Sequence, residues 1–362
     1  MPLAQPLTGV GTYTLELAHA LAATTPRDQF ELISPLPFDE GVFHKTKAAN
    51  LELVYSRPNP LHRRWWTFGL PSYVRRNALT LFHGTNYEVP LRGQCPSIVT
   101  IHDLSLLVHS STHQARAVAR ARLLMPMMAR KARLIITPSE LIKNEVSDYF
   151  KIRPEKVFAI PLAPRTSFWP VPLSETTETC RRIGIEDGFL LFVGTIEPRK
   201  NLSTLVRALE ELLRTTDLRP QLVVAGKPGW KSEELLSDLQ RSFARERVHL
   251  VGFLPDEELR ALYSCCRLFI YPSIYEGFGL PPLEAMACGA PVIASRVPSI
   301  KKSVARIVSA TDFRELAQTI AELLTDERAR QSFSIRGREY ARKFSWQNTA
   351  ALTREVYSQA LN

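Results

Sequence analysis

Short apolar runs alternate with helical patterns along the whole chain, and this alternation constrains the fold more than any other feature. Runs of four to seven residues rich in Val, Ile, Leu and Phe predict strands, and strands that alternate with helices predict parallel βαβ units. The chain is therefore predicted to be α/β. The runs lie at residues 30–34, 51–55, 80–84, 97–102 and 133–139, and then at 189–194, 221–226, 248–252, 267–273 and 291–295.

A proline-rich connector at residues 159–172 separates the two series of runs. With 362 residues, the chain is too long for one compact core and suits two domains. We expect an N-terminal Rossmann-like domain at residues 1–165 and a C-terminal one at residues 166–345. A final helix, capped by Ser345, is expected at residues 346–362.

The segment 272–289 predicts a binding site. Glu276 lies in a glycine-bearing loop after an apolar run, and Glu284 lies eight residues later, in the expected first turn of a short helix. Open α/β sheets bind ligands where their strands end. The helix-start amides of Gly279 and Leu280 suit a phosphate, and the two carboxylates suit sugar hydroxyls. Together these features predict a nucleotide-sugar site.

The extended motif Y-E-G-F-G-L-P-P-L-E-A-M-A-C-G-A-P-V-I-A-S at residues 275–295 resembles the E-x7-E signature of retaining GT-B glycosyltransferases of family 4. The resemblance implies two Rossmann-like domains that face each other across a cleft. It also implies a final helix that crosses back to the N-terminal domain. In this reading Glu276 contacts hydroxyls of the transferred sugar, and Glu284 binds the ribose hydroxyls of the donor.

A second loop, at residues 193–202, supplies Arg199 and Lys200. Two cations beside the site would offset the charge of a diphosphate in the ground state and as it leaves. The loop resembles the family's phosphate-binding loop, although Thr195 stands where many relatives have arginine. No D-x-D sequence is present. We therefore expect no metal and no cofactor, only a nucleotide-diphosphate sugar as donor substrate.

Four loops of the first half resemble family loops. Gly9 and Gly11, in the segment 7–14, would let backbone amides approach the donor. His102, at the end of a predicted strand, resembles the histidine that lies beside the transferred sugar. Residues 82–86 and 136–140 resemble further family loops, and residues 226–230 lie where relatives contact the nucleotide base.

Positive charge is concentrated in the first half, where residues 1–165 hold 20 lysines and arginines against 12 carboxylates. No nucleic-acid recognition motif accompanies this charge. An anionic inner-leaflet membrane surface or a diphosphate-linked acceptor fits it, and a solvated basic face is the alternative. Without an apolar run of 18 residues or a secretory signal, we expect a cytoplasmic protein, peripheral on the inner membrane at most.

We expect transfer of a hexose, with mannose and GDP-mannose preferred, to a glycan or lipid-linked acceptor with retention of anomeric configuration. Two departures from the family pattern stand out. We expect the first strand ahead of the glycine loop to be missing, and the segment around residues 301–304 is short. These departures leave a truncated, non-catalytic remnant as one alternative. A nucleotide-sugar 2-epimerase, which uses the same fold without an acceptor, is the other.

Overall fold

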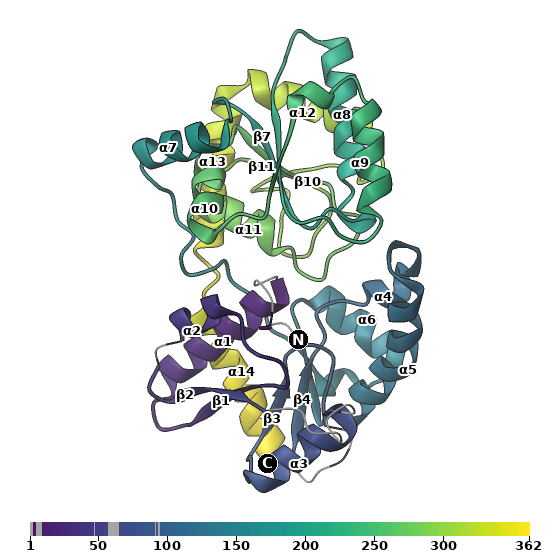
Figure 1. Cartoon of the computed structure of the whole chain (residues 1–362), viewed down its shortest axis with the longest axis vertical. Helices are drawn as coiled ribbons and strands as arrows, with labels where there is room; N and C mark the ends of the chain where they lie inside the picture. Colours follow the sequence, from purple (N-terminus) through teal and green to yellow (C-terminus); the bar gives the residue numbers. More distant parts are fainter. Residues whose placement is uncertain (1–2, 5–8, 47, 57–64, 91, 93–94) are drawn as a thin grey trace. The chain divides into compact units, whose positions relative to one another are not determined.

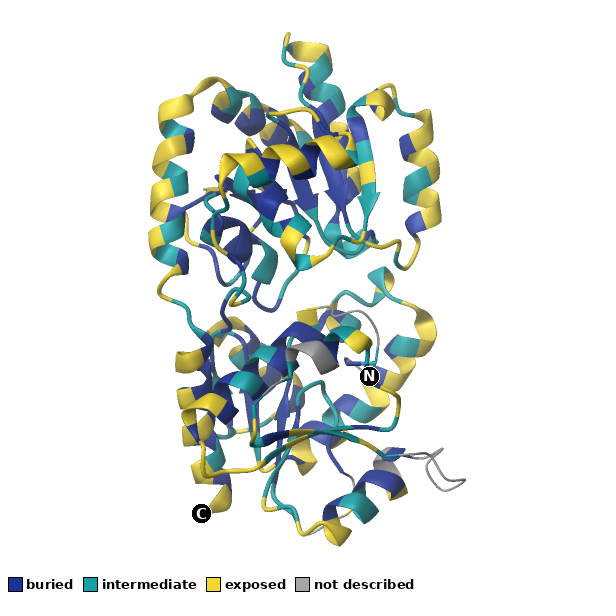
Figure 2. Cartoon of the chain, turned by 60° about the vertical axis from the view of Figure 1, so that its left-hand side comes forward, coloured by how far each residue is buried: buried dark blue, intermediate teal, exposed yellow. Residues whose placement is uncertain are grey.

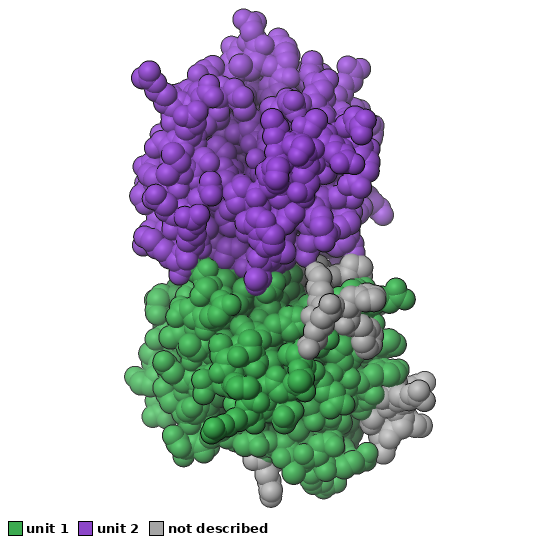
Figure 3. All heavy atoms as spheres, turned by 90° about the vertical axis from the view of Figure 1, so that its left-hand side faces the viewer, with its two compact units in different colours: residues 1–108, 115–163, 344–362 green, residues 109–114, 164–343 purple. Residues whose placement is uncertain are grey.

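The computed structural model describes residues 3–4, 9–46, 48–56, 65–90, 92 and 95–362, and it separates into two compact units (Figures 1 and 3). Unit 1 contains residues 1–108, 115–163 and 344–362, and unit 2 contains residues 109–114 and 164–343. The chain therefore leaves unit 1 within the proline-rich connector and returns to it for the C-terminal helix.

Unit 2 is built on a parallel sheet of six strands in the order β12-β11-β10-β7-β8-β9. This order reverses between β7 and β10, as in dinucleotide-binding sheets. The strands are β7 (Leu190–Val193), β8 (Leu222–Ala225), β9 (Val248–Gly252), β10 (Leu268–Tyr271), β11 (Val292–Ala294) and β12 (Arg306–Ile307).

Helices cover both faces of this sheet (Figure 1). One face packs against α8, α9 and α12 around a large apolar core, and α10, α11 and α13 lie on the other side. The central strands β7, β8 and β10 are buried except at Val193, whereas the helices expose their outer faces (Figure 2). The helices are α7 (Leu173–Ile183), α8 (Leu202–Thr215), α9 (Ser232–Arg241), α10 (Asp256–Cys265), α11 (Leu280–Ala287), α12 (Phe313–Thr325) and α13 (Glu327–Ala341).

Unit 1 holds two separate parallel sheets among its described residues. One is the pair β1-β2, and the other has four strands in the order β3-β4-β5-β6. The strands are β1 (Phe30–Ser34), β2 (Leu51–Tyr55), β3 (Phe82–Gly84), β4 (Ser97–Thr100), β5 (Leu134–Thr137) and β6 (Val157–Ala159). The helices are α1 (Gly9–Thr24), α2 (Glu40–Lys45), α3 (Leu70–Arg76), α4 (Ser105–Val108), α5 (Ala115–Lys131), α6 (Glu140–Phe150) and α14 (Trp346–Leu361).

The C-terminal helix α14 packs against α1 and contributes to the core of unit 1. Val356 and Ala360 on α14 lie against Ile98 and Ile136 of the four-stranded sheet. The predicted cap of this helix is confirmed, because the Ser345 side chain accepts a hydrogen bond from a backbone amide three residues on.

Candidate functional site

The loops that follow β7 and β10 form the best candidate site in unit 2. These strands are neighbours at the point where the strand order reverses, so their carboxyl ends meet in the position where such sheets bind ligands. The loop after β7 carries Arg199 and Lys200, and the loop after β10 carries Glu276. The structure brings these three predicted residues together.

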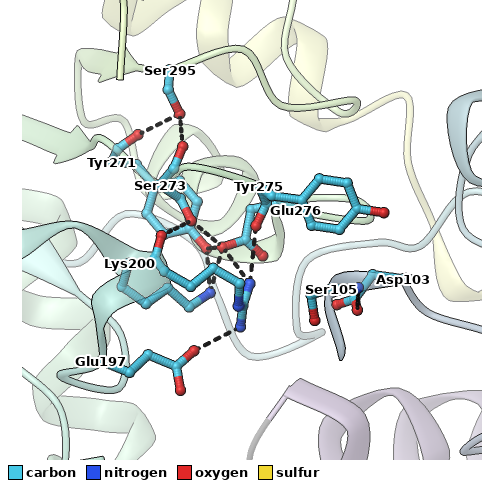
Figure 4. A network of polar contacts seen from close by, with 10 residues as sticks. Asp103, Ser105, Glu197, Lys200, Tyr271, Ser273, Tyr275, Glu276 and Ser295 are labelled. Atoms are coloured by element: carbon cyan, nitrogen blue, oxygen red, sulfur yellow. Dashed lines mark hydrogen bonds and ion pairs between the residues drawn. The ribbon is translucent and has the colours of Figure 1, made fainter. Parts of the chain in front are cut away.

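Glu276 lies at the centre of this cluster (Figure 4). Its Oε1 atom accepts hydrogen bonds from the Lys200 ammonium at 2.6 Å and the Tyr271 hydroxyl at 2.9 Å. The Ser273 hydroxyl donates to the same oxygen, and Nη1 of Arg199 lies 3.1 Å from it. Among the described residues the second oxygen, Oε2, has no hydrogen-bond partner.

The electrostatics of the cluster keep Glu276 ionised. Burial by itself would raise the pKa of this carboxyl, but Lys200 and Arg199 outweigh burial and hold the pKa at about 2. The side chain is only 10% exposed. An ionised carboxylate with one uncommitted oxygen can accept further hydrogen bonds, as sugar hydroxyls would provide.

The two predicted phosphate-binding cations are already balanced by carboxylates. Arg199 donates to Glu197 at 2.8 Å and to the Tyr275 carbonyl at 3.0 Å, while Lys200 faces Glu276. Two cations and two anions leave this cluster with no net charge. An incoming diphosphate would therefore share these cations with carboxylates that are already bound to them.

Glu284 belongs to a different network and does not lie in the first turn of its helix. Helix α11 begins at Leu280, so Glu284 is its fifth residue, and the prediction of a first-turn position is wrong. Its side chain is 4% exposed and receives two hydrogen bonds from Arg165, Nε to Oε1 at 2.7 Å and Nη2 to Oε2 at 2.8 Å. Arg165 also binds Asp256 at 2.6 Å and lies over the Phe168 ring.

The start of α11 presents the two predicted amides. The helix begins at Leu280 after the N-cap Gly279, and the first N-H groups of a helix have no partner within it, whereas the next two residues, Pro281 and Pro282, have no N-H group. Gly279 has a φ of +95°, and a Cβ atom there would come within 3.2 Å of the Ser299 hydroxyl. Glycine is therefore required at the point where the loop enters the helix.

The loops after β7 and β8 pack closely against one another. A Cβ atom on Gly226 would lie 1.9 Å from the carbonyl oxygen of Gly194, and the Ile196 amide donates to the Lys227 carbonyl at 2.9 Å. These contacts hold the predicted base-contacting segment 226–230 beside the loop that carries the two cations. Its contact with a base stays a prediction.

In unit 1, His102 follows β4 and is held in one tautomer. Its Nε2 atom donates to the Thr85 carbonyl at 2.8 Å, and its ring meets the edge of Tyr13 at 4.8 Å. Burial lowers the pKa of His102 more than the Thr85 carbonyl and Asp103 raise it, so the ring is neutral at pH 7. Nδ1 can then accept a hydrogen bond.

Gly9 and Gly11 differ from the prediction in their conformation. They lie in the first turn of α1 and not in a loop ahead of it. The first N-H groups of a helix have no partner within that helix, so these positions still offer backbone donors to an anion. Contact with the donor sugar stays a prediction.

The sequence analysis did not identify several residues that bind these side chains in the structure. Arg165 lies in the proline-rich segment that reads as a linker, and Tyr271 and Ser273 lie at the end of a strand that reads as core. In unit 1, Thr100 links the Tyr13 hydroxyl to the His83 ring. Tyr271, Ser273 and Thr100 could have been found from the sequence, because each is a polar residue at the carboxyl end of a predicted strand.

Neither a metal centre nor a membrane span is found within the described ranges. No group of three or more potential His, Cys, Asp or Glu ligands occurs there. No helix among these residues is both long enough and apolar enough to cross a bilayer.

Comparisons with known proteins place these observations in context. Residues 7–164 match the family model Glycosyltransferase Family 4, and residues 179–340 match Glycosyl transferases group 1. The chain is 30% identical to the O-antigen chain mannosyltransferase B of Escherichia coli, covering 98% of this chain and 97% of that protein. It is 28% identical to the MMP alpha-(1->4)-mannosyltransferase of Mycolicibacterium hassiacum, covering 98% and 95%.

Two solved structures share the fold at low sequence identity. HepE of Anabaena, in complex with UDP and glucose, superposes with a TM-score of 0.78 at 18% identity, covering 98% of this chain and 97% of that one. WaaG, described as a glycosyltransferase involved in lipopolysaccharide biosynthesis, gives 0.74 at 15% identity, covering 97% and 96%.

Proposed function

This chain is a GT-B glycosyltransferase of family 4, and we propose that it transfers mannose from a nucleotide-diphosphate sugar, with GDP-mannose preferred, to a glycan or lipid-linked acceptor. The preference for mannose is supported by the two mannosyltransferases to which nearly the whole chain is similar. Family 4 membership accords with retention of the anomeric configuration.

The uncommitted Oε2 atom of Glu276 is the observation that carries this proposal. In our assignment Oε2 accepts hydrogen bonds from hydroxyls of the transferred sugar, while Lys200 and Arg199 contact the diphosphate. The amides of Gly279 and Leu280 contribute to the same anion. Arg165 uses one lone pair on each oxygen of Glu284, and the remaining pairs suit the donor ribose.

The reaction we propose needs no protein nucleophile. The bond between the anomeric carbon and the phosphate oxygen breaks, and the acceptor oxygen bonds to that carbon from the same face. The acceptor proton passes to the departing phosphate oxygen, whose negative charge Lys200 and Arg199 stabilise. Among the unit 1 residues, we assign Nδ1 of His102 to the transferred sugar and the helix start at Gly9 and Gly11 to the donor. No metal or other cofactor takes part in this scheme.

The test is a transfer assay with purified protein, radiolabelled GDP-mannose and a panel of mannoside and lipid-linked acceptors. We expect transfer from GDP-mannose, loss of transfer in Glu276→Gln, and an α-linked product if the donor is α-linked. Transfer from UDP-glucose alone would contradict the donor assignment. Interconversion of the donor without an acceptor would instead support the 2-epimerase alternative, and no reaction with any donor would support the remnant.

We further propose that unit 1 associates with an anionic membrane surface from the cytoplasmic side, and that it binds no nucleic acid. Helix α5 exposes five basic side chains and, among them, two apolar ones, Leu123 and Met127. Basic side chains near such a surface contribute roughly 1 kcal/mol each, and inserted apolar groups add to this. The basic residues are Arg116, Arg120, Arg122, Arg130 and Lys131.

Unit 1 has further basic residues of this kind, since Arg75 and Arg76 end α3 with exposed side chains. Arg63 and Arg64 lie outside the described residues.

Vesicle sedimentation at low salt tests the membrane proposal. Replacing three arginines of α5 by serine should weaken binding to phosphatidylglycerol vesicles by at least tenfold. The matched control replaces three exposed arginines of unit 2, Arg314, Arg328 and Arg336, and should bind like wild type. If both triple variants lost vesicle binding equally, the binding would be non-specific charge attraction and the proposal would be wrong.

A further inference from the structure

Two cysteine side chains meet between helices α7 and α10 of unit 2. Cys180 lies near the end of α7, and Cys265 is the last residue of α10. Their sulfur atoms lie 3.6 Å apart, although the residues are 85 positions apart in the sequence. Because Cys265 comes just before β10 begins at Leu268, the pair lies at the opposite edge of the sheet from the loop that carries Glu276. Both cysteines are thiols, and the proposed transfer reaction does not use them.

The two sulfurs are close enough to form a disulfide bond after a small movement. Bonded sulfurs lie about 2.05 Å apart, so these two must approach each other by roughly 1.5 Å. The chain leaves α10 directly after Cys265, since the C-cap residue Cys266 has an extended backbone with φ −62° and ψ 143°. Cys265 is therefore not held by a following helical turn.

One sulfur of the pair is activated. A hydrogen bond from the Cys265 thiol lowers the pKa of Cys180 more than burial and the nearby Asp187 raise it. The thiolate is the form of cysteine that reacts with peroxides. Cys180 is buried, but Cys265 is partly exposed, so a small oxidant can reach the pair from the Cys265 side.

The other three cysteines are poor competitors for an oxidant. Burial raises the pKa of Cys95, Cys266 and Cys288, in the case of Cys288 to about 12. These three side chains therefore remain thiols at pH 7, and Cys266 and Cys288 are buried as well.

Helix α7 lies at the edge of unit 2 and packs on α10 (Figure 1). Of its 11 residues it buries Thr176, Thr179 and Cys180, and none of these has a large apolar side chain. Its first residue, Leu173, is 78% exposed. The attachment of α7 therefore gains little from hydrophobic burial.

Ion pairs supply part of the attachment between the two helices. Arg260 of α10 binds Glu175 of α7 at 2.9 Å, and Arg182 of α7 binds Glu258 of α10 at 3.0 Å. Glu175 is 44% exposed and Arg182 is 60% exposed, so water competes for both pairs. A helix that is held by such contacts would be held much more firmly by a covalent link.

Helix α10 also anchors the segment that carries Arg165. Its first residue, Asp256, binds Arg165, and the Ser264 hydroxyl near its end accepts a hydrogen bond from the Val171 amide at 3.3 Å. The chain from Arg165 to Cys180 is thus bound to α10 at several points. A link between Cys180 and Cys265 would fasten the far end of this segment.

We propose that Cys180 and Cys265 form a redox-sensitive pair, which a peroxide converts to a disulfide bond that fastens α7 to α10 and stabilises unit 2. The site is a modification site and is independent of the sugar donor. A dithiol reductant returns the pair to two thiols by thiol–disulfide exchange.

The oxidation takes two steps. The Cys180 sulfur attacks one oxygen of hydrogen peroxide, the O–O bond breaks, and Cys180 becomes a sulfenic acid. The hydroxide that leaves takes up the proton that Cys180 released and becomes water. The Cys265 sulfur then attacks the Cys180 sulfur, the S–O bond breaks, and the departing hydroxide takes the Cys265 proton as a second water. Two sulfurs are oxidised and two peroxide oxygens are reduced.

The first measurement identifies the bond. Reduced protein is treated with hydrogen peroxide at pH 7, remaining thiols are alkylated, and peptides are analysed by mass spectrometry without reductant. We expect a link between Cys180 and Cys265 that dithiothreitol removes. Fragmentation between Cys265 and Cys266 shows which of these two neighbours is bonded. A link through Cys266 or Cys288, a disulfide between two copies of the chain, or sulfinic acid without a link would overturn the proposal.

The second measurement tests what the bond does. Oxidised wild type should melt about 5 °C or more above reduced wild type, because a link across 85 positions restricts the unfolded chain. Amide exchange in α7 should slow at least tenfold on oxidation, and dithiothreitol should reverse both changes.

Three variants complete the test. Cys265→Ser changes a partly exposed side chain and should respond to peroxide in neither measurement, and Cys180→Ala should behave in the same way. The matched control, Cys95→Ser in unit 1, should respond as wild type does. If oxidised and reduced wild type melt together, or if Cys265→Ser gains stability as wild type does, this disulfide does not fasten α7 and the proposal is wrong.

Discussion

Removing the carboxylate of Glu284 should cost stability as well as donor binding, because this carboxylate is the main partner of Arg165. Both side chains are largely buried, at 4% and 17% exposure, and two hydrogen bonds join them. In Glu284→Ala, the one ion-pair partner that the guanidinium keeps among the described residues is Asp256, which is 25% exposed. Breaking a buried pair on one side typically costs about 3–5 kcal/mol.

This cost has a measurable size. For a unit of 150–250 residues, 1 kcal/mol corresponds to about 2–4 °C in melting temperature, so Glu284→Ala should melt roughly 6–20 °C lower. The matched control is Glu322→Ala, which removes a glutamate whose pair with Arg306 is about half exposed. That surface pair should contribute less than about 1 kcal/mol.

A double variant separates the two roles of Glu284. Replacing Arg165 by Met together with Glu284→Gln removes both charges, and Asp256 can remain hydrated at the surface. We expect this variant to regain most of the lost stability. If Glu284 binds the donor ribose, calorimetry should still find weaker GDP binding in the refolded double variant.

Two results would refute this reasoning. If Glu284→Ala melts within 1 °C of wild type, the Arg165 pair does not support the fold. If the double variant is stable and binds GDP as wild type does, Glu284 makes no contact with the nucleotide, and its role is structural.

Three further changes test the rest of the site. Glu276→Gln should abolish transfer yet strengthen GDP binding severalfold in calorimetry, because the cluster gains one positive charge. If the variant lost GDP binding together with transfer, the cluster would not be electrically neutral in the wild type. The low pKa of Glu276 should contribute on the order of 3 kcal/mol to stability, fully above pH 4.5 and not at all once the pH has fallen to about 2. The difference in the free energy of urea unfolding between wild type and Glu276→Gln should therefore shrink over that pH range. Gly226→Ala should unfold unit 2 at lower temperature than Gly188→Ala, since both have positive φ but only the first meets the Gly194 backbone; equal melting curves would show that the loops can separate.

Most strands could be predicted from the sequence because each is a short apolar run. The segment 248–252 coincides with β9, and 30–34 and 51–55 coincide with β1 and β2. The strands β6 and β12 were not predicted. They have three and two residues and lie outside the apolar runs from which strands were predicted, and each forms because a neighbouring strand offers a paired edge.

The site was predictable where it depends on strand ends and not where it depends on distant contacts. Arg199, Lys200 and Glu276 follow two strands that are adjacent in this sheet order, so the motif positions imply their proximity. The pairing of Arg165 with Glu284 joins residues 119 positions apart. A buried carboxylate requires a cation, but nothing local shows that a single arginine in a proline-rich segment supplies it.

The two glutamates of the motif share one loop and helix but are bound in opposite ways. The described residues that donate hydrogen bonds to Glu276 all donate to Oε1, which leaves Oε2 able to accept hydrogen bonds from a substrate. Glu284 engages both oxygens with one guanidinium that also fixes Asp256 of α10. The first arrangement can take and release substrate hydroxyls without exposing an unpaired charge, whereas the second cannot lose a hydrogen bond without leaving part of a buried cation unpaired. We therefore propose that Glu276, and not Glu284, contacts the reacting sugar. The contribution of Glu284 to the donor depends first on its holding α11 to the segment that carries Arg165.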